Sequence, residues 1–94
     1  MLVLSRKLHE IIVVGDHLLV THMGYAPRSG LYTFTIADER DERDGRIVQM
    51  QVEDVVEVTN GVAMKLIKGR GTKVSLGLTA PADVHIDRLE VRQK

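Results

Sequence analysis

Apolar residues in this chain recur at every second position within short runs, and no stretch keeps a helical period over the length of a helix. The segment LYTFTI, residues 31–36, alternates apolar side chains with threonine, and IVQMQV, residues 47–52, alternates again. This period of two is that of a strand with one buried face, whereas an amphipathic helix repeats about every 3.6 residues. Turn signals such as Gly15-Asp16 and Asn60-Gly61 separate the runs. The sequence therefore predicts an all-β fold of short antiparallel strands.

The strands are expected where apolar runs lie between turn residues. Three segments are expected to be loops: residues 25–30 with Pro27 and Gly30, the acidic hairpin tip at residues 37–45, and the glycine-rich turn at residues 68–73. After the last strand the tail is expected to add at most a turn or two of helix. The expected strands begin at the chain start and continue with residues 11–14, 17–23, 31–36, 47–52, 54–58, 62–67, 74–78 and 84–88.

The first strand opens with MLVLS, and Arg6 and Lys7 follow directly. A chain end that begins apolar needs a partner strand, because chain ends otherwise fray. The expected partner is the far end, residues 83–91, which carries Arg88. Side by side, the two segments would place Arg6, Lys7 and Arg88 on one cationic ridge. Because Arg6 and Lys7 are neighbours, they face opposite sides of a strand.

The chain length favours one domain, and at 94 residues a domain buries its core inefficiently, which favours association between copies. The chain has no cysteine, so disulfides, thiolate metal sites and a thiol nucleophile are excluded. No apolar run approaches the roughly 18 residues of a membrane span. The start lacks a signal peptide's basic region followed by a long apolar run. We therefore expect a cytoplasmic protein that does not enter a membrane.

Charge is unevenly distributed along the chain, although the formal net charge is zero. Residues 25–61 hold eight acids and four bases, a net charge of −4, and all three aromatic residues, Tyr25, Tyr32 and Phe34. The remaining residues carry a net charge of +4. The chain is thus a mildly basic body interrupted by an acidic, β-patterned middle.

The two outer parts of the chain carry motifs in a fixed order. The start, MLVLSRK followed by Glu10 and IIVVGD, resembles the opening of the carbon storage regulator family (CsrA/RsmA), MLxLxRK-x-x-E-x-I-x-I-G-D. The end, GRGTKVSLGLTAPADVHIDRLEV, resembles the close of that family, G-x-x-V-x-I-G-x-x-A-P-x-x-V-x-V-x-R-x-E. The resemblance describes a single domain, residues 1–94, interrupted by an insertion at about residues 25–61.

The resemblance implies both a fold and a task. The implied fold is a small interlocked homodimer, in which the first strand of one copy runs beside the last strand of the other, with an extra β-hairpin from the insertion. The implied task is to bind GGA-containing single-stranded loops of messenger RNA near the ribosome-binding site, or of small regulatory RNA. Such binding represses translation or alters message stability, no cofactor is needed, and a protein antagonist can be a further partner. The residues implied to contact RNA are Leu4, Ser5, Arg6, Lys7, Ala80, Pro81, Val84, His85, Ile86 and Arg88.

Arg88 is the strongest candidate among these residues. Its guanidinium presents five donors in one plane, which suits a guanine edge or a phosphate. The alternative is an ordinary surface ion pair of Arg88 with Asp87 or Glu90. The flanking strands carry no aromatic residue, so recognition is expected from backbone groups and arginine instead of base stacking.

The chain also departs from the family pattern. Positions where the family often carries a basic or neutral residue hold Ser75 and Asp87, and both changes weaken attraction for phosphate. Two registers of the insertion stay open: it follows Gly24, or it begins near His17 and residues 62–67 are the family's third strand. The acids of the insertion are expected to reach over the cationic ridge and to compete with RNA.

No residue pattern indicates catalysis or metal binding. The segment KGRGTK, residues 68–73, lacks the order of a phosphate-binding loop and is expected to be a basic turn whose cations touch the RNA backbone. The acids Asp38, Asp41 and Asp44 do not match calcium-loop spacing. The chain is therefore expected not to be an enzyme. Four histidines are expected to be scattered on the surface: His9, His17, His22 and His85.

An alternative function belongs to a different class. The chain can be a CsrA-like protein-interaction module or antagonist that has lost most RNA affinity. In this interpretation Tyr32 and Phe34 make a new contact with a protein partner.

Overall fold

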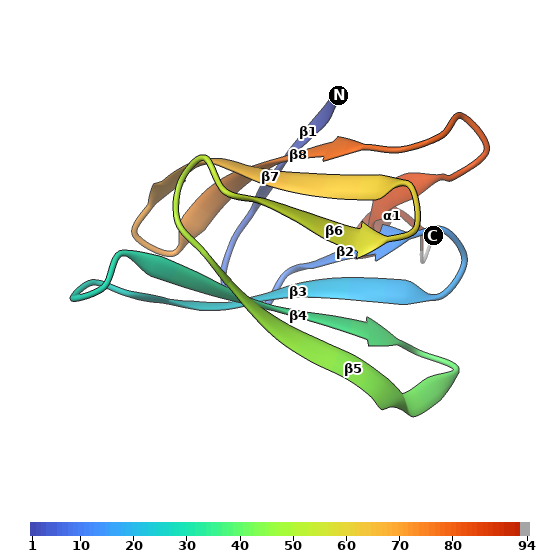
Figure 1. The fold of residues 1–94 in the computed structure, drawn as a ribbon, viewed down its shortest axis with the longest axis horizontal. Coiled ribbons are helices and arrows are strands. Elements are labelled where there is room, and N and C mark those ends of the chain that lie inside the picture. Colours follow the sequence, from blue (N-terminus) through green and yellow to red (C-terminus); the bar gives the residue numbers. More distant parts are fainter. Residues whose placement is uncertain (93–94) are drawn as a thin grey trace.

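The computed structural model describes residues 1–92, apart from the side chains of residues 42–44 and 92, and it confirms the all-β expectation. The strands form two antiparallel sheets, with orders β1-β8-β7-β6 and β5-β4-β3-β2-β9 (Figure 1). The helical turn α1 is too short to cross a membrane, and the described part of the chain holds no other helix. The elements are β1 (Leu2–Arg6), β2 (Ile11–Val14), β3 (Leu18–Ala26), β4 (Leu31–Asp38), β5 (Asp41–Met50), β6 (Val55–Thr59), β7 (Val62–Arg70), β8 (Lys73–Thr79), β9 (Ile86–Arg88) and α1 (Leu89–Arg92).

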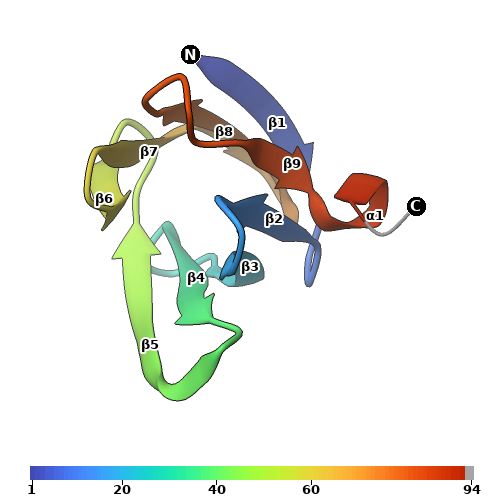
Figure 2. The same cartoon turned by 90° about the vertical axis from the view of Figure 1, so that its right-hand side faces the viewer.

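The two sheets enclose a common interior, as Figure 2 shows. Alternate side chains of each strand point inward, and both sheets contribute to one hydrophobic cluster. Phe34, Met64 and Leu66 are fully buried in it. The alternation in residues 31–36 therefore predicted the inward face of β4 correctly. The cluster consists of Ile12, Val14, Val20, Tyr32, Phe34, Ile36, Met50, Val58, Val62, Met64, Leu66, Val74, Leu76 and Leu78.

The first strand does not pair with the last strand within one chain. β1 pairs with β8, from Leu2 opposite Leu78 to Arg6 opposite Val74, and β9 pairs with β2. The reason lies in β8, whose residues 74–78 are all buried. Buried backbone amide and carbonyl groups need hydrogen-bond partners, and β1 and β7 supply them along the two edges of β8. The expected pairing between the first strand of one copy and the last strand of another stays a prediction.

The β3–β4 hairpin is longer than expected. Residues 25–30 were expected to be loop, but β3 continues through Ala26. A bulge between His22 and Gly24 shifts the register, and the pairing with β4 resumes beyond it. The Tyr25 ring then stacks on the Tyr32 ring across the hairpin, with centroids 4.4 Å apart. The turn itself is closed by the Gly30 amide, which donates to the Ala26 carbonyl oxygen at 2.8 Å.

The other expected turns are shorter than expected. The strand expected at residues 47–52 begins and ends earlier, and the last strand is shorter than expected. At the acidic tip, β4 runs to Asp38 and β5 begins at Asp41, since the Asp38 carboxylate accepts a hydrogen bond from the Arg40 amide at 2.9 Å. Within residues 68–73, β7 and β8 reduce the turn to two residues, with Gly71 at a φ of +60°. β5 ends at Met50, β9 spans Ile86–Arg88, and α1 is one turn.

The two sheets leave two seams where edge strands are not paired with each other: β5 with β6, and β1 with β9. An arginine closes the first seam. The Arg46 Nη2 group donates to the carbonyl oxygens of Glu57 and Val58 on β6, the latter at 3.1 Å. A second arginine, Arg6, closes the seam that carries the predicted RNA-contact residues.

Candidate nucleic-acid interface

The predicted RNA-contact residues belong to the two strands of the β1–β9 seam and to the segment that joins β8 to β9. One group belongs to β1 and its end, residues 4–7, and the other follows β8 and reaches Arg88 at the end of β9. Because Leu2 is opposite Leu78 and Arg6 is opposite Val74, Ala80 and Pro81 lie near the start of β1, away from Arg6. Pro81 lies beside the β6–β7 turn, where a Cβ on Gly61 would lie 3.4 Å from its ring. The structure therefore does not gather these residues at one point.

Arg6 is buried, with an exposed fraction of 3%, and its guanidinium is fully engaged within the protein. Its Nη1 and Nη2 groups donate to the two carboxylate oxygens of Glu90 at 2.9 and 2.8 Å. Nη1 also donates to the Ile11 carbonyl oxygen at 3.1 Å, and Nε to the Ser5 carbonyl oxygen at 2.8 Å. The hydrogen bond with Glu90 raises the pKa of Arg6 and lowers the pKa of Glu90 to about 2. Arg6 thus clamps the seam, and the expected exposed ridge of Arg6, Lys7 and Arg88 does not form in this chain.

Arg88 is exposed at the end of β9, opposite Ile12 of β2. Its charge contributes to the lowered pKa of Glu90, so Arg88 lies near the Arg6–Glu90 clamp. Both oxygens of the Glu90 carboxylate already accept hydrogen bonds from Arg6. Glu90 is therefore held by Arg6, and the guanidinium of Arg88 is accessible to solvent.

The remaining predicted residues divide between core and surface. The side chains that pack partly against the hydrophobic cluster are those of Leu4, Ala80, Val84 and Ile86. The exposed residues are Ser5, Lys7, Pro81 and His85. The first set contributes to packing in this fold, and the second is accessible to a ligand.

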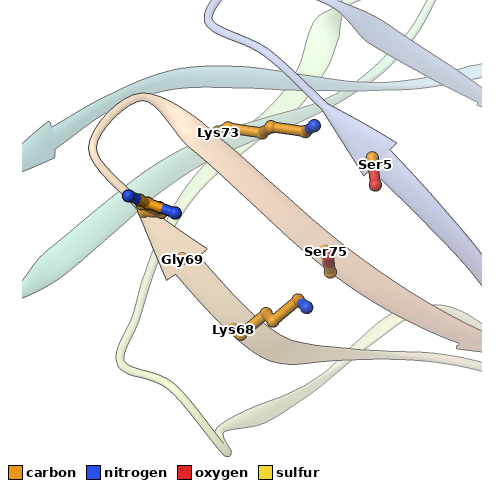
Figure 3. A pocket seen from close by; sticks show the side chains of 6 residues that line it. Ser5, Lys68, Gly69, Lys73 and Ser75 are labelled. Carbon is orange, nitrogen blue, oxygen red and sulfur yellow. The ribbon is translucent and has the colours of Figure 1, made fainter.

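A cationic hollow opens on the outer face of the β1-β8-β7 sheet, with a volume of about 300 Å³. In Figure 3 the ammonium groups of Lys68 and Lys73 extend over the hollow toward Ser75 and Ser5. The strand register explains this gathering, since Ser75 lies opposite both Ser5 and Lys68, while Lys73 lies opposite Arg70. Among the described residues the lining contains no acid: Ser5, Lys68, Gly69, Arg70, Lys73 and Ser75.

A bulge creates this hollow, and sequence analysis did not predict it. The register of β7 and β8 shifts between Leu66 and Lys68, so Leu66 points into the core and Lys68 lies on the outer face, opposite Ser75. With regular alternation both side chains would share one face. Gly69 then faces the core beneath the hollow, where a Cβ would collide with the Tyr32 hydroxyl. The three cations of residues 68–73 were the available signal, but their convergence depends on the bulge.

The acidic β4–β5 turn does not lie over the hollow. The Asp38 carboxylate lies 3.4 Å from Nε2 of His17, and the Arg40 amide that donates to it lowers the pKa of Asp38. Figure 1 shows the β4–β5 turn at the opposite end of the molecule from the β7–β8 turn. Asp38 and Glu39 therefore lie away from the hollow, while the side chains of residues 42–44 lie outside the described residues. The expectation that the acids of the insertion compete with RNA stays a prediction.

The histidines are not all on the surface. His22 is 1% exposed, and its Nε2 lies 2.9 Å from the carbonyl oxygen of Thr72 in the β7–β8 turn. Its ring packs against Phe34, with centroids 5.4 Å apart, and burial lowers the pKa of His22. Among the side chains that the structure describes, no three His, Asp or Glu residues gather as metal ligands.

Comparison of this chain with models of known protein families, with curated proteins and with solved structures finds no match.

Proposed function

We propose that this protein is a cytoplasmic regulator that binds single-stranded RNA and acts by binding, without catalysis. Its targets are GGA-containing loops of messenger RNA or small regulatory RNA. Binding over a ribosome-binding site would repress translation or alter message stability. The observation that carries the proposal is the cationic hollow, lined without acids, which opens beside the unpaired edge of β1. The motifs at both ends of the chain, which resemble those of the carbon storage regulator family, support the same function.

The hollow supplies the general attraction for a nucleic acid. Phosphate contacts made by lysine and arginine account for most sequence-independent affinity, and they weaken as salt rises. Lys68, Arg70 and Lys73 provide three such cations although the formal net charge of the chain is zero. The binding surface is therefore a local feature that the net charge conceals.

Base recognition is assigned to Arg88 and to the peptide groups of the β1 edge. An edge strand presents unpaired amide and carbonyl groups, and Arg88 is exposed near the same seam. Tyr32 and Phe34 are 4% and 0% exposed, and thus do not form a stacking platform for bases. Their burial also shows that the expected contact of these two residues with a protein partner is wrong.

The apolar edge of β1 supports a homodimer as part of the proposal. Leu2 and Val3 are 43% and 53% exposed on an edge strand, which is a ready site for pairing with another chain. A second copy that pairs with the start of this edge, at Leu2 and Val3, and leaves the end at Ser5 to RNA would join two RNA sites in one particle. Sedimentation of the protein at several concentrations measures this association.

The proposal is tested with a labelled GGA hairpin, the same hairpin with GGA changed to CCA, and two salt concentrations. We expect preferential binding to GGA and a modest loss of affinity at higher salt, because few phosphates are contacted. Arg88→Ala should cost about 1–3 kcal/mol of discrimination between the hairpins, with an unchanged melting temperature. Arg28→Ala, which removes an exposed arginine from the β3–β4 turn, is the matched control.

Equal affinity of the wild-type protein for the two hairpins would contradict the proposal and favour the protein-interaction module. A large drop in the melting temperature of Arg88→Ala would instead make Arg88 a structural residue.

A further inference from the structure

The cations of the hollow are concentrated at one spot and not spaced along a groove. They lie on the end of one hairpin, where Lys73 is opposite Arg70 and Lys68 is opposite Ser75. Ser75 is in turn opposite Ser5 on β1. Three neighbouring strands about 4.8 Å apart make a site roughly 10 Å wide. This width suits a compact anion better than an extended backbone.

The hollow is built by the fold and does not depend on chance side-chain positions. The bulge in β7 brings Lys68 to the outer face, and Gly69 lies directly over the Tyr32 ring in the core. Ser75 is only 9% exposed, so its hydroxyl lies in the floor among the three cations. Like charges gathered without an acid repel one another, and a bound anion relieves this repulsion.

The charge of the hollow exceeds what a phosphate within an RNA chain requires. An internal phosphodiester carries a single negative charge, whereas a terminal phosphate carries about −1.5 to −2 near neutral pH. A terminal triphosphate carries more charge within a similar width. Three cations with two hydroxyl groups match such a group, because the guanidinium of Arg70 binds phosphate oxygens in a fork and lysine ammonium groups act as point charges.

We propose that the hollow binds the phosphate groups at the 5′ end of an RNA strand. This inference rests on the proposed function and deepens it by naming the part of the RNA that the hollow recognises. Ser5 connects the hollow with the β1 edge, since its side chain lines the hollow and its backbone belongs to β1. An RNA held by its 5′ end would thus continue along the strand to which base contacts are assigned.

The test uses one short GGA-containing RNA made with a 5′-hydroxyl, a 5′-monophosphate or a 5′-triphosphate end, and measures each dissociation constant at fixed salt. The triphosphate RNA should bind at least about tenfold more tightly than the hydroxyl RNA, with the monophosphate between them. The variant Lys68→Gln/Lys73→Gln should reduce this ratio to about twofold or less. Lys65→Gln should keep it, because Lys65 lies on the same strand but pairs with Glu53 at 3.0 Å.

The outcomes separate this inference from the proposed function. Equal affinity for the three ends would overturn the inference and leave the proposed function standing, because the hydroxyl RNA would still bind. Equal affinity for a free nucleoside triphosphate and for the triphosphate RNA would overturn the assignment to RNA. If no RNA binds, the proposed function fails. Titration with inorganic triphosphate, monitored by the NMR shifts of the backbone amides, then tests whether the hollow binds phosphate. Shifts confined to residues 5, 68–70, 73 and 75 would uphold a phosphate site, and their absence would overturn it.

Discussion

Replacing Arg6 with methionine tests whether the β1–β9 seam depends on the guanidinium. Methionine keeps an unbranched apolar stem but removes four hydrogen bonds, which end on Glu90, Ile11 and Ser5. Hydrogen bonds with charged groups contribute about 1.5–3 kcal/mol each. The side chain of Glu90 is 55% exposed and can hydrogen-bond to water once Arg6 is removed. The loss of stability therefore comes mainly from the carbonyl oxygens of Ser5 and Ile11, which are left without Arg6. We expect unfolding to become easier by about 2–4 kcal/mol.

This loss is large for the chain, because a domain of this size has a total stability of about 5–14 kcal/mol. Chemical denaturation at neutral pH measures it, and the melting temperature should fall by about 10–20 °C. Glu90→Gln is the companion variant and should lose less, because glutamine keeps one acceptor for Arg6. A change below about 0.5 kcal/mol in Arg6→Met would refute the clamp.

The clamp also predicts a dependence on pH. The hydrogen bond from Arg6 lowers the pKa of Glu90 to about 2 from an ordinary value of 4.5. A lowered carboxyl pKa contributes stability that is present above pH 4.5 and is lost as the pH falls toward 2. The difference in stability between the wild-type protein and Arg6→Met should therefore narrow across this window. A constant difference would show that Arg6 acts through packing alone.

Two further predictions concern the core beneath the hollow. Burial lowers the pKa of His22, so the folded protein binds fewer protons there, and stability measured by denaturation should decrease as the pH falls below about 6.5; His22→Phe should reduce that dependence, and an unchanged slope would contradict the buried state. Gly69→Ala should destabilise the protein by about 1–3 kcal/mol, because the new methyl group meets the Tyr32 hydroxyl. Tyr32→Phe should restore part of the loss in the double variant, and full additivity of the two changes would argue against this contact.

Strand positions could be predicted from the sequence because a half-buried strand has a period of two. The alternation in residues 31–36 placed Tyr32 and Phe34 on one face, and both are buried. The same period predicted that Arg6 and Lys7 face opposite sides, and Arg6 is buried while Lys7 is exposed. Period alone does not say which of two neighbours faces inward, because that depends on a partner far along the chain. Here the partner is Glu90, which lies in the last helical turn.

The features that escaped prediction arise where the regular period is broken. A bulge turns Lys68 to the outer face and thereby creates the hollow, and no local residue signal fixes its position. His22 was expected on the surface, although it shares the parity of the buried Val20 and occupies an inward position. The even spacing from Val20 therefore indicated that His22 faces inward, but its polar side chain led to the prediction of a surface position.

The pairing of β1 with β8 has a consequence for how the chain reaches its folded state. Leu2 pairs with Leu78, so during synthesis the first strand cannot pair until almost the whole sequence has been made. Most strands here pair with the next strand in the chain, whereas this pairing closes a loop of more than seventy residues, so we expect β1 to be among the last strands to join the sheet. During that interval an apolar strand is unprotected, and newly synthesised molecules at high concentration are prone to aggregate through it.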